Sequence, residues 1–140
     1  VQYVKIAQDI HVQNYMGTKL FEAVKTKIED QTIGEDYLSL LNDYIKPMTI
    51  FWTMVEYLPH AVYTIANKGV YKHFSDNSDV LSSDEVDFLV EKNRGIAQNY
   101  SRRFVDYMCF NAPSKFPEYY ENRNEDLHPE REANFNGWHL

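Results

Sequence analysis

Apolar side chains recur every three or four residues along most of the chain, which is the spacing of helices that bury one face. The first such stretch runs to about Met16 and has no capping residue before it, so we expect further residues to precede Val1. Gly17 is expected to stop this helix in the left-handed conformation, with Thr18 as the N-cap of a second helix over residues 18–30. The apolar face of the second helix carries Leu20, Phe21, Val24 and Ile28.

A longer stretch with the same spacing covers residues 35–66 and is expected to be the central helix. Its apolar positions are Leu38, Leu41, Ile45, Met48, Trp52, Val55 and Leu58. Pro47 and Pro59 interrupt it, and each lacks an amide hydrogen and clashes with the preceding turn, so a kink or break is expected near each. Residues 67–69 are typical of a helix end, and the turn-forming residues within 70–81 predict an exposed loop.

The last helix is expected to begin at Ser82, which forms a capping box with Glu85, and to stop at Pro113. Its apolar positions are Val86, Leu89, Val90, Ile96, Tyr100, Phe104, Tyr107 and Met108. Residues 113–140 lose the helical period but keep five aromatic side chains, Phe116, Tyr119, Tyr120, Phe135 and Trp138. This composition is not that of a solvated linker, so we expect an arm that docks on the domain or on a neighbour.

These patterns together predict an all-α fold, an antiparallel helical bundle of about four to five helices with a kinked central helix. The helical domain is expected at residues 1–112 and an extended C-terminal arm at 113–140. Only the short segments 69–74 and 135–140 have a composition compatible with strands.

Composition narrows the classes of function. The chain has 140 residues, which fits one domain around a single core. Its formal net charge of -7 and sequence pI near 5.1 argue against tight nucleic-acid binding, because such binding needs clustered Lys and Arg. The one cysteine, Cys109, cannot form an intramolecular disulfide, which favours a reducing compartment and cytosolic synthesis. No signal peptide and no apolar run of about 18 residues occurs, so no membrane association is expected.

Glu56 and His60 are the candidate metal ligands, because residues four apart lie on one face of a helix. A di-iron carboxylate site needs two Glu-x-x-His motifs and two further Glu residues, and this pair of motifs is not present. An ordinary surface pair is therefore the preferred interpretation, and no metal site is expected. The remaining histidines, His11, His73, His128 and His139, are interpreted as structural or solvated.

Other signatures of catalysis are missing from the sequence. Cys109 lies between Met108 and Phe110 at the end of an apolar helix face, so it is predicted to be a buried, inert thiol. The carboxylate-rich residues 76–87 lack the Asp-x-Asp-x-Asp-Gly pattern of a calcium loop and are interpreted as solvated. No phosphate-binding glycine loop, nucleophile elbow or zinc spacing occurs. The sequence therefore predicts no enzymatic activity, no catalytic residue and no cofactor.

A basic run lies along the last helix, at Lys92, Arg94, Arg102 and Arg103. Most such runs are a solvated helix face. The alternative is a cationic stripe that pairs with the acidic surface of another copy, and a heterologous contact of this kind closes into a ring when the rotation permits.

The order of several short segments resembles the neck proteins of crAss-like and related tailed phages of Bacteroidetes, which are head-to-tail connector or ring proteins. The segments are residues 7–13 (AQDIHVQ), 16–21 (MGTKLF), 41–47 (LNDYIKP), 67–70 (NKGV), 75–78 (SDNS) and 135–140 (FNGWHL), with Tyr100, Arg103 and Tyr107 of the last helix. The resemblance covers nearly the whole chain, although none of these segments has a chemical signature.

The resemblance implies a virion protein, made in the bacterial cytoplasm, that forms a twelvefold ring beneath the portal. Its partners would be the portal protein, other neck or tail proteins, and the genome DNA that passes through without sequence-specific binding. Net negative charge suits this role, because like charge discourages the duplex from sticking to the lumen. An aromatic arm from Phe116 onward would order on a neighbouring subunit during assembly.

Two other classes of protein remain open from the sequence. A cytosolic helical-bundle adaptor module would keep its aromatic tail folded back on its own domain. A metal-binding helical-bundle enzyme would need Glu56 and His60 to converge with further ligands.

Overall fold

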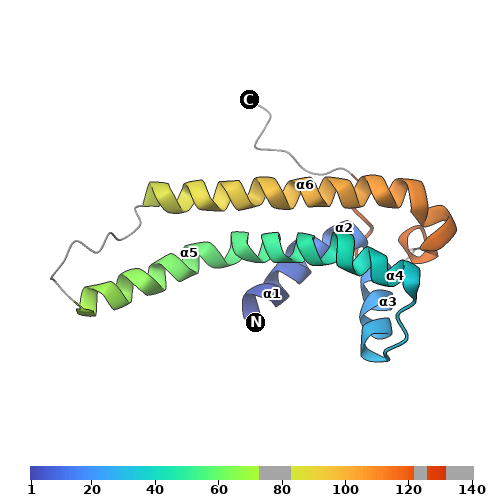
Figure 1. Cartoon of the computed structure of the whole chain (residues 1–140), viewed down its shortest axis with the longest axis horizontal. Helices are drawn as coiled ribbons and strands as arrows, with labels where there is room; N and C mark the ends of the chain where they lie inside the picture. The colour runs from blue at the N-terminus through green and yellow to red at the C-terminus, as the bar shows by residue number, and fades with distance from the viewer. Residues whose placement is uncertain (73–82, 122–125, 132–140) are drawn as a thin grey trace.

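The computed structural model describes residues 1–72, 83–121 and 126–131, and for residues 62–72 it describes the backbone only. Over this part of the chain the fold is all-α, with four continuous helical segments that pack together and no strand. The predicted fold class is therefore confirmed. Two long antiparallel helices lie side by side, and the shorter N-terminal helices pack toward one end of this pair (Figure 1).

The four segments have the following bounds. The first comprises α1 (Gln2–Ala7), a π-helical turn (Gln8–Val12) and α2 (Gln13–Met16). The second is α3 (Thr18–Glu29). The third comprises α4 (Glu35–Leu40), a π-helical turn (Leu41–Ile45) and α5 (Lys46–Lys72). The fourth is α6 (Ser83–Lys115), which a 3-10 turn (Pro117–Tyr119) follows.

The corner between α2 and α3 is built around Gly17. Gly17 stops the first helix as predicted and has a positive φ of 79°, but its ψ of 152° lies outside the left-handed helical region. A Cβ atom at this position would lie 2.8 Å from the ring of Pro129, so the close approach of the C-terminal segment requires glycine. The prediction that Thr18 caps α3 was wrong, because Gly17 occupies the cap position and Thr18 is the first helical residue.

The central helix is continuous from Glu35 to Lys72, so the expected end at residues 67–69 was wrong. The central helix tolerates Pro47 because a π-helical turn lies just before it. In this turn the Lys46 amide donates to the Leu41 carbonyl, five residues back. This wider turn makes room where the proline ring removes a hydrogen bond. Pro59 lies inside α5, and the helix bends along its length (Figure 1).

Helix α6 continues through Pro113 to Lys115, so the prediction that Pro113 stops it was also wrong. The hydrogen bond that Pro113 cannot donate is lost near the end of the helix. The Phe116 amide then donates to the Ala112 carbonyl at 2.9 Å. The expected capping box cannot be compared, because Ser82 lies outside the described residues, as does the predicted loop from residue 73 onward. Residues 69–72 are helical, so the strand considered there is not formed, and residues 73–74 and 135–140 also lie outside the described part.

The core lies between α5, α6 and the N-terminal helices. Its largest fully buried side chains are Tyr119, Phe104, Phe116, Met16, Leu20, Leu40, Met48 and Met108. Trp52 of α5 crosses to α6, where its indole N–H donates to the Ser101 hydroxyl at 2.9 Å. Phe116 and Tyr119 come from the predicted arm, yet both have no exposed surface. They are core residues of the subunit itself, and an arm that orders on a neighbour therefore does not begin at Phe116.

The described C-terminal segment, residues 126–131, docks on the subunit's own domain. The Thr18 amide donates to the Leu127 carbonyl at 3.0 Å, and the Leu127 amide donates to the Thr18 hydroxyl at 2.9 Å. The Glu130 amide donates to the Asn14 carbonyl at 2.8 Å. These bonds hold the segment across the α2–α3 corner, so the part of the arm that is described takes the first of its two predicted positions, on the domain. No helix in the described part of the chain is both long enough and apolar enough to cross a membrane.

Candidate interaction surface

The side of α6 opposite its buried residues carries two well-exposed phenylalanines. Phe88 is 67% exposed and Phe110 is 87% exposed. At about 100° per residue they share a face, about 33 Å apart, with four exposed polar residues between them. We call this the outward face of α6, and its residues are Phe88, Lys92, Asn99, Arg103, Asp106 and Phe110. Single exposed apolar side chains are ordinary on protein surfaces, so the pair needs a second observation.

Gly95 supplies it. This glycine lies near the middle of the 33-residue helix, on the same side as the two phenylalanines, and it is exposed. Among the described residues, no atom lies within 4 Å of the position that a Cβ atom would take, so nothing in this part of the subunit requires glycine there. Glycine in a helix interior costs about 1 kcal/mol relative to alanine. A residue that destabilises the subunit and leaves the helix backbone open is typical of close contact with another molecule.

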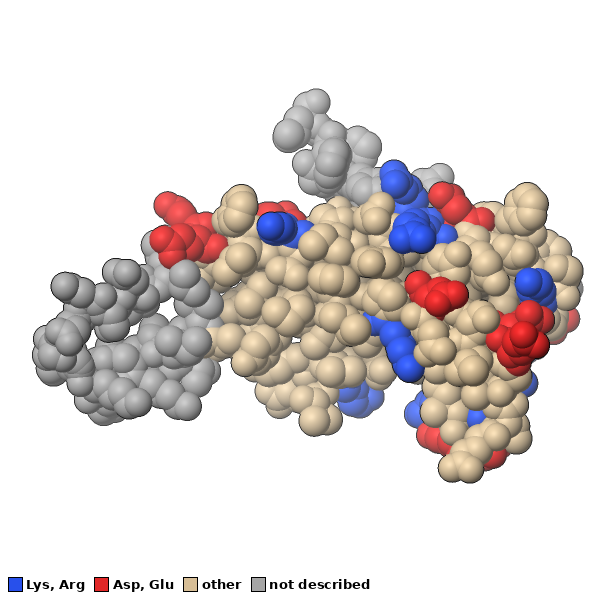
Figure 2. Space-filling model, viewed as in Figure 1, with Lys and Arg blue, Asp and Glu red and all other residues tan. Residues whose placement is uncertain are grey.

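The basic side chains of this helix are concentrated in its middle. Residues 92–105 contain four basic residues and no acidic one. They do not form the single stripe that was the alternative interpretation of the sequence, because Arg94 points about 200° away from Lys92. Arg94 donates to Glu91 at 3.3 Å and contributes to the low pKa of His11, so it lies on the inner side. Lys92 and Arg103 are on the outward face, and blue side chains lie over the middle of α6 in Figure 2.

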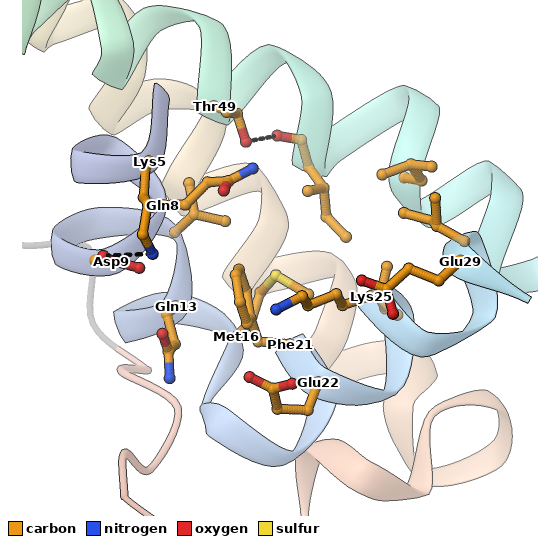
Figure 3. Close-up of a pocket in the computed structure, with 15 residues that line it drawn as sticks. Lys5, Gln8, Asp9, Gln13, Met16, Phe21, Glu22, Lys25, Glu29 and Thr49 are labelled. Carbon is orange, nitrogen blue, oxygen red and sulfur yellow. Dashed lines mark hydrogen bonds and ion pairs between the residues drawn. The ribbon is translucent and has the colours of Figure 1, made fainter. Parts of the chain in front are cut away.

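A second surface feature is a groove of about 340 Å³ between the N-terminal helix, α3 and the α4–α5 helix (Figure 3). Its floor is apolar and its rim is charged. The apolar residues are Val12, Met16, Phe21, Val24, Ile28, Leu41 and Ile45. On one rim Lys5 and Asp9 form an ion pair at 3.3 Å, and Glu22 and Lys25 of α3 lie on the other. Such a groove can hold an apolar side chain of a peptide, but its mixed rim charge selects no particular ligand.

The predicted metal candidates do not come together. Glu56 pairs with His11, whose Nε2 lies 2.9 Å from Glu56 Oε1, while the ring of His60 lies beside Tyr3 at 5.2 Å. No cluster of three or more His, Cys, Asp or Glu side chains suited to a metal ion occurs in the described part of the chain. The chain has one Glu-x-x-His sequence, ending at His128, in the non-helical C-terminal segment, and its Glu lies outside the described residues.

His11 has a structural role, which is one of the two interpretations, structural or solvated, that the sequence allowed for this histidine. Its ring stacks on Trp52 with centroids 3.9 Å apart and planes 9° apart. Burial lowers the pKa of His11, and this effect exceeds the opposing effects of the hydrogen bond and charge of Glu56. The histidine therefore fastens the N-terminal helix to α5 in its neutral form.

The prediction of a buried thiol was wrong, because Cys109 is exposed. Its neighbour Met108 is fully buried, and one residue further along a helix points about 100° away. Phe110 turns still further, onto the outward face. Of the carboxylate-rich segment 76–87, residues 83–87 form the first turn and a half of α6, and residues 76–82 lie outside the described part.

The outward face of α6 was largely missed from the sequence, although a signal existed. Phe88 and Phe110 fall outside the apolar spacing that defines the buried side of α6, and Gly95 lies in a helical stretch without a turn signal. Each deviation alone is unremarkable, and only the helix geometry shows that all three are on one side.

Comparison with known proteins gives a family but no activity. No curated protein and no solved structure matches the chain. One family model, described as a family of unknown function (DUF6712), matches residues 12–127. That range includes α3, α4, α5 and α6 together with the Phe116–Tyr119 part of the core. The chain therefore belongs to the DUF6712 family.

Proposed function

We propose that this protein is a self-associating structural subunit of a phage neck, forming a ring between portal and tail through which DNA passes. The observation that carries the proposal is the outward face of α6, where Phe88 and Phe110 are exposed on either side of Gly95. Burying one phenylalanine contributes about 1.5 to 3 kcal/mol, so two per contact supply a substantial part of an association energy.

The assignment to a neck ring rests on further support. The segments quoted above resemble phage neck proteins over nearly the whole chain. The net charge of -7 per copy suits a ring around DNA, because repeated negative charge keeps the duplex from binding to the wall. The family match adds no activity that would compete with a structural role.

Electron microscopy of the purified protein at increasing concentration tests the ring directly. We expect rings of one size, twelvefold in symmetry, and antibody labelling at the neck of purified virions. The variant Phe88→Ala/Phe110→Ala should fold but assemble poorly, whereas Ile50→Ala, which shortens an exposed side chain on α5, should assemble normally. Virions without label at the neck would contradict the location, and particles of irregular size would contradict the ring.

A second candidate is favoured by a different observation. Phe116, Tyr119 and residues 126–131 lie against their own domain, which is the arrangement expected of a monomeric adaptor module. The groove beside α3 would then be its peptide site. A protein that stays monomeric at all concentrations, with peptide binding lost on substituting Phe21 or Ile28, would favour this candidate over the ring.

A further inference from the structure

The junction between α3 and α4 is an acidic corner with exposed apolar side chains. Residues 28–45 contain five acidic residues and no basic one. We call Ile28, Glu29, Asp30, Glu35, Asp36, Leu38 and Asp43 the acidic corner. Ile28 is 46% exposed and Leu38 is 43% exposed. Asp36 has an ion pair with Lys115 at 3.8 Å, and the other four carboxylates have no basic partner among the described residues.

The acidic corner complements the outward face of α6 in both charge and polarity. The corner offers unpaired carboxylates beside two aliphatic side chains. The outward face offers Lys92 and Arg103 between two phenylalanines, with Asp106 as the one acidic residue of the face. Opposite charge across an interface speeds encounter and sets the register, and apolar side chains at its centre supply affinity.

The two surfaces lie on different sides of the molecule. In Figure 1, α6 runs along one side of α5, whereas α3 projects from the other side. One subunit therefore cannot join its own two surfaces, but successive subunits can do so repeatedly. A contact between two different patches is heterologous, and it generates a closed ring when the rotation per subunit closes.

We propose that the outward face of α6 in one copy docks on the acidic corner of the next copy. One of the two phenylalanines packs beside Ile28 and Leu38, since these two lie much closer together than Phe88 and Phe110, and the basic residues of α6 face the free carboxylates. Gly95 lets the α6 backbone approach its neighbour closely. This contact rests on the proposed self-association and specifies the surfaces that carry it.

Reciprocal charge reversal tests the contact. Lys92→Glu/Arg103→Glu makes both surfaces of a subunit acidic, and Glu29→Lys/Asp30→Lys/Glu35→Lys, which leaves only Asp36 and Asp43 as acids in the corner, makes both basic. Each variant alone should self-associate roughly 100-fold more weakly than the wild type, because like charges then face each other. An equimolar mixture of the two should assemble again, with the copies alternating, because every contact then joins opposite charges. Sedimentation velocity and native mass spectrometry measure assembly and composition.

A matched control separates the contact from the effect of net charge. Lys25→Glu/Lys46→Glu makes the same charge change as the α6 variant, at two exposed lysines off the outward face without an ion pair among the described residues. This control should assemble like the wild type. Circular dichroism of every variant should show the wild-type helix content, since all the substituted side chains are exposed.

The outcomes distinguish the contact from the ring. If the wild type assembles and both reversal variants assemble equally well, the proposed contact is wrong. The same holds if the wild type assembles but the mixture of the two variants does not. Neither result contradicts the ring. Absence of assembly in the wild type and in the mixture would overturn both. Labelled duplex DNA that binds wild type but not Lys92→Glu/Arg103→Glu, without any self-association, would assign the outward face to nucleic acid instead.

Discussion

His11 joins the N-terminal helix to the rest of the molecule through one ring. It stacks on Trp52, which bonds Ser101 of α6, and it shares a hydrogen bond with Glu56 of α5. Through Trp52, this contact connects the N-terminal helix, α5 and α6. Because burial lowers the pKa of His11, the charged imidazolium is less favourable in the folded subunit than in the unfolded chain.

The first prediction concerns pH. A base whose pKa is lower in the folded state stabilises the fold above its unfolded pKa, about 6.5, and loses this contribution as the pH falls. The free energy of unfolding should therefore fall between pH 7.5 and pH 5.5. His11→Phe keeps a ring on Trp52 but cannot titrate, so urea unfolding should show a smaller fall in the variant. An equal fall in both proteins would assign the pH dependence to other groups.

Phe116 and Phe110 provide a matched pair of phenylalanines six residues apart. Phe116 has no exposed surface, whereas Phe110 is 87% exposed. We expect Phe116→Ala to lower the free energy of unfolding of the subunit by about 3 to 5 kcal/mol, because it opens a cavity. Phe110→Ala should change it by less than about 0.5 kcal/mol at concentrations where the protein is monomeric. Denaturant unfolding of both variants measures the difference, and equal effects would contradict the placement of Phe116 in the core.

Tyr119 has a buried hydroxyl without a hydrogen-bond partner in the described part of the chain. Burial, as the largest cause, raises its pKa to about 12. Stability should therefore fall as the pH rises from about 10 toward 12, because ionisation is less favourable in the folded state. Tyr119→Phe removes the contribution of this hydroxyl, so the alkaline fall should be smaller, and it should stabilise the protein by about 1 kcal/mol at neutral pH. A destabilised variant would indicate that the hydroxyl has a partner in the folded protein.

At the scale of the elements, Gly95 relates the stability of α6 to its proposed contact. Gly95→Ala should raise the free energy of unfolding of the monomer by about 1 kcal/mol, since the added methyl group meets open space. The same substitution should weaken self-association if a neighbouring backbone lies against this turn. Thermal unfolding and sedimentation of one preparation measure the two effects. A variant with higher stability and unchanged assembly would remove Gly95 from the contact.

Helical periodicity predicted where the four helical segments lie, but not all of their ends. Pro47 was expected to kink or break the central helix, and the π-helical turn that keeps the helix continuous depends on a change of hydrogen bonding that side-chain spacing does not indicate. Pro113 was expected to stop α6, yet it loses only one bond in the last turn. Phe116 and Tyr119 follow no helical period, so their burial became evident only once the chain was seen to fold back on α3 and α6.

The candidate surface was less accessible to sequence reasoning than the fold. The basic run of α6 was recognised, but Arg94, one of its four residues, lies on the inner side, away from the phenylalanines. Glu56 was assigned to His60 by spacing, whereas the partner it contacts, His11, lies 45 residues away in the sequence. Pairs between helices depend on packing, which the spacing within one helix cannot show.

At the scale of the whole molecule, the proposed contact gives each subunit two complementary surfaces on different sides. The charge distribution follows from this arrangement: a net charge of -7 coexists with a basic outward face on α6 and an acidic corner between α3 and α4. Assembly driven partly by charge should weaken as salt increases, since ions screen exposed charges over about 8 Å at physiological ionic strength.

Native mass spectrometry of the wild-type protein over a range of concentrations shows whether the subunits self-associate into a ring. We expect a single large assembly whose mass is a fixed multiple of 16.6 kDa and whose population rises with concentration. A protein that remains a monomer throughout, or that forms a continuous series of sizes, would contradict it.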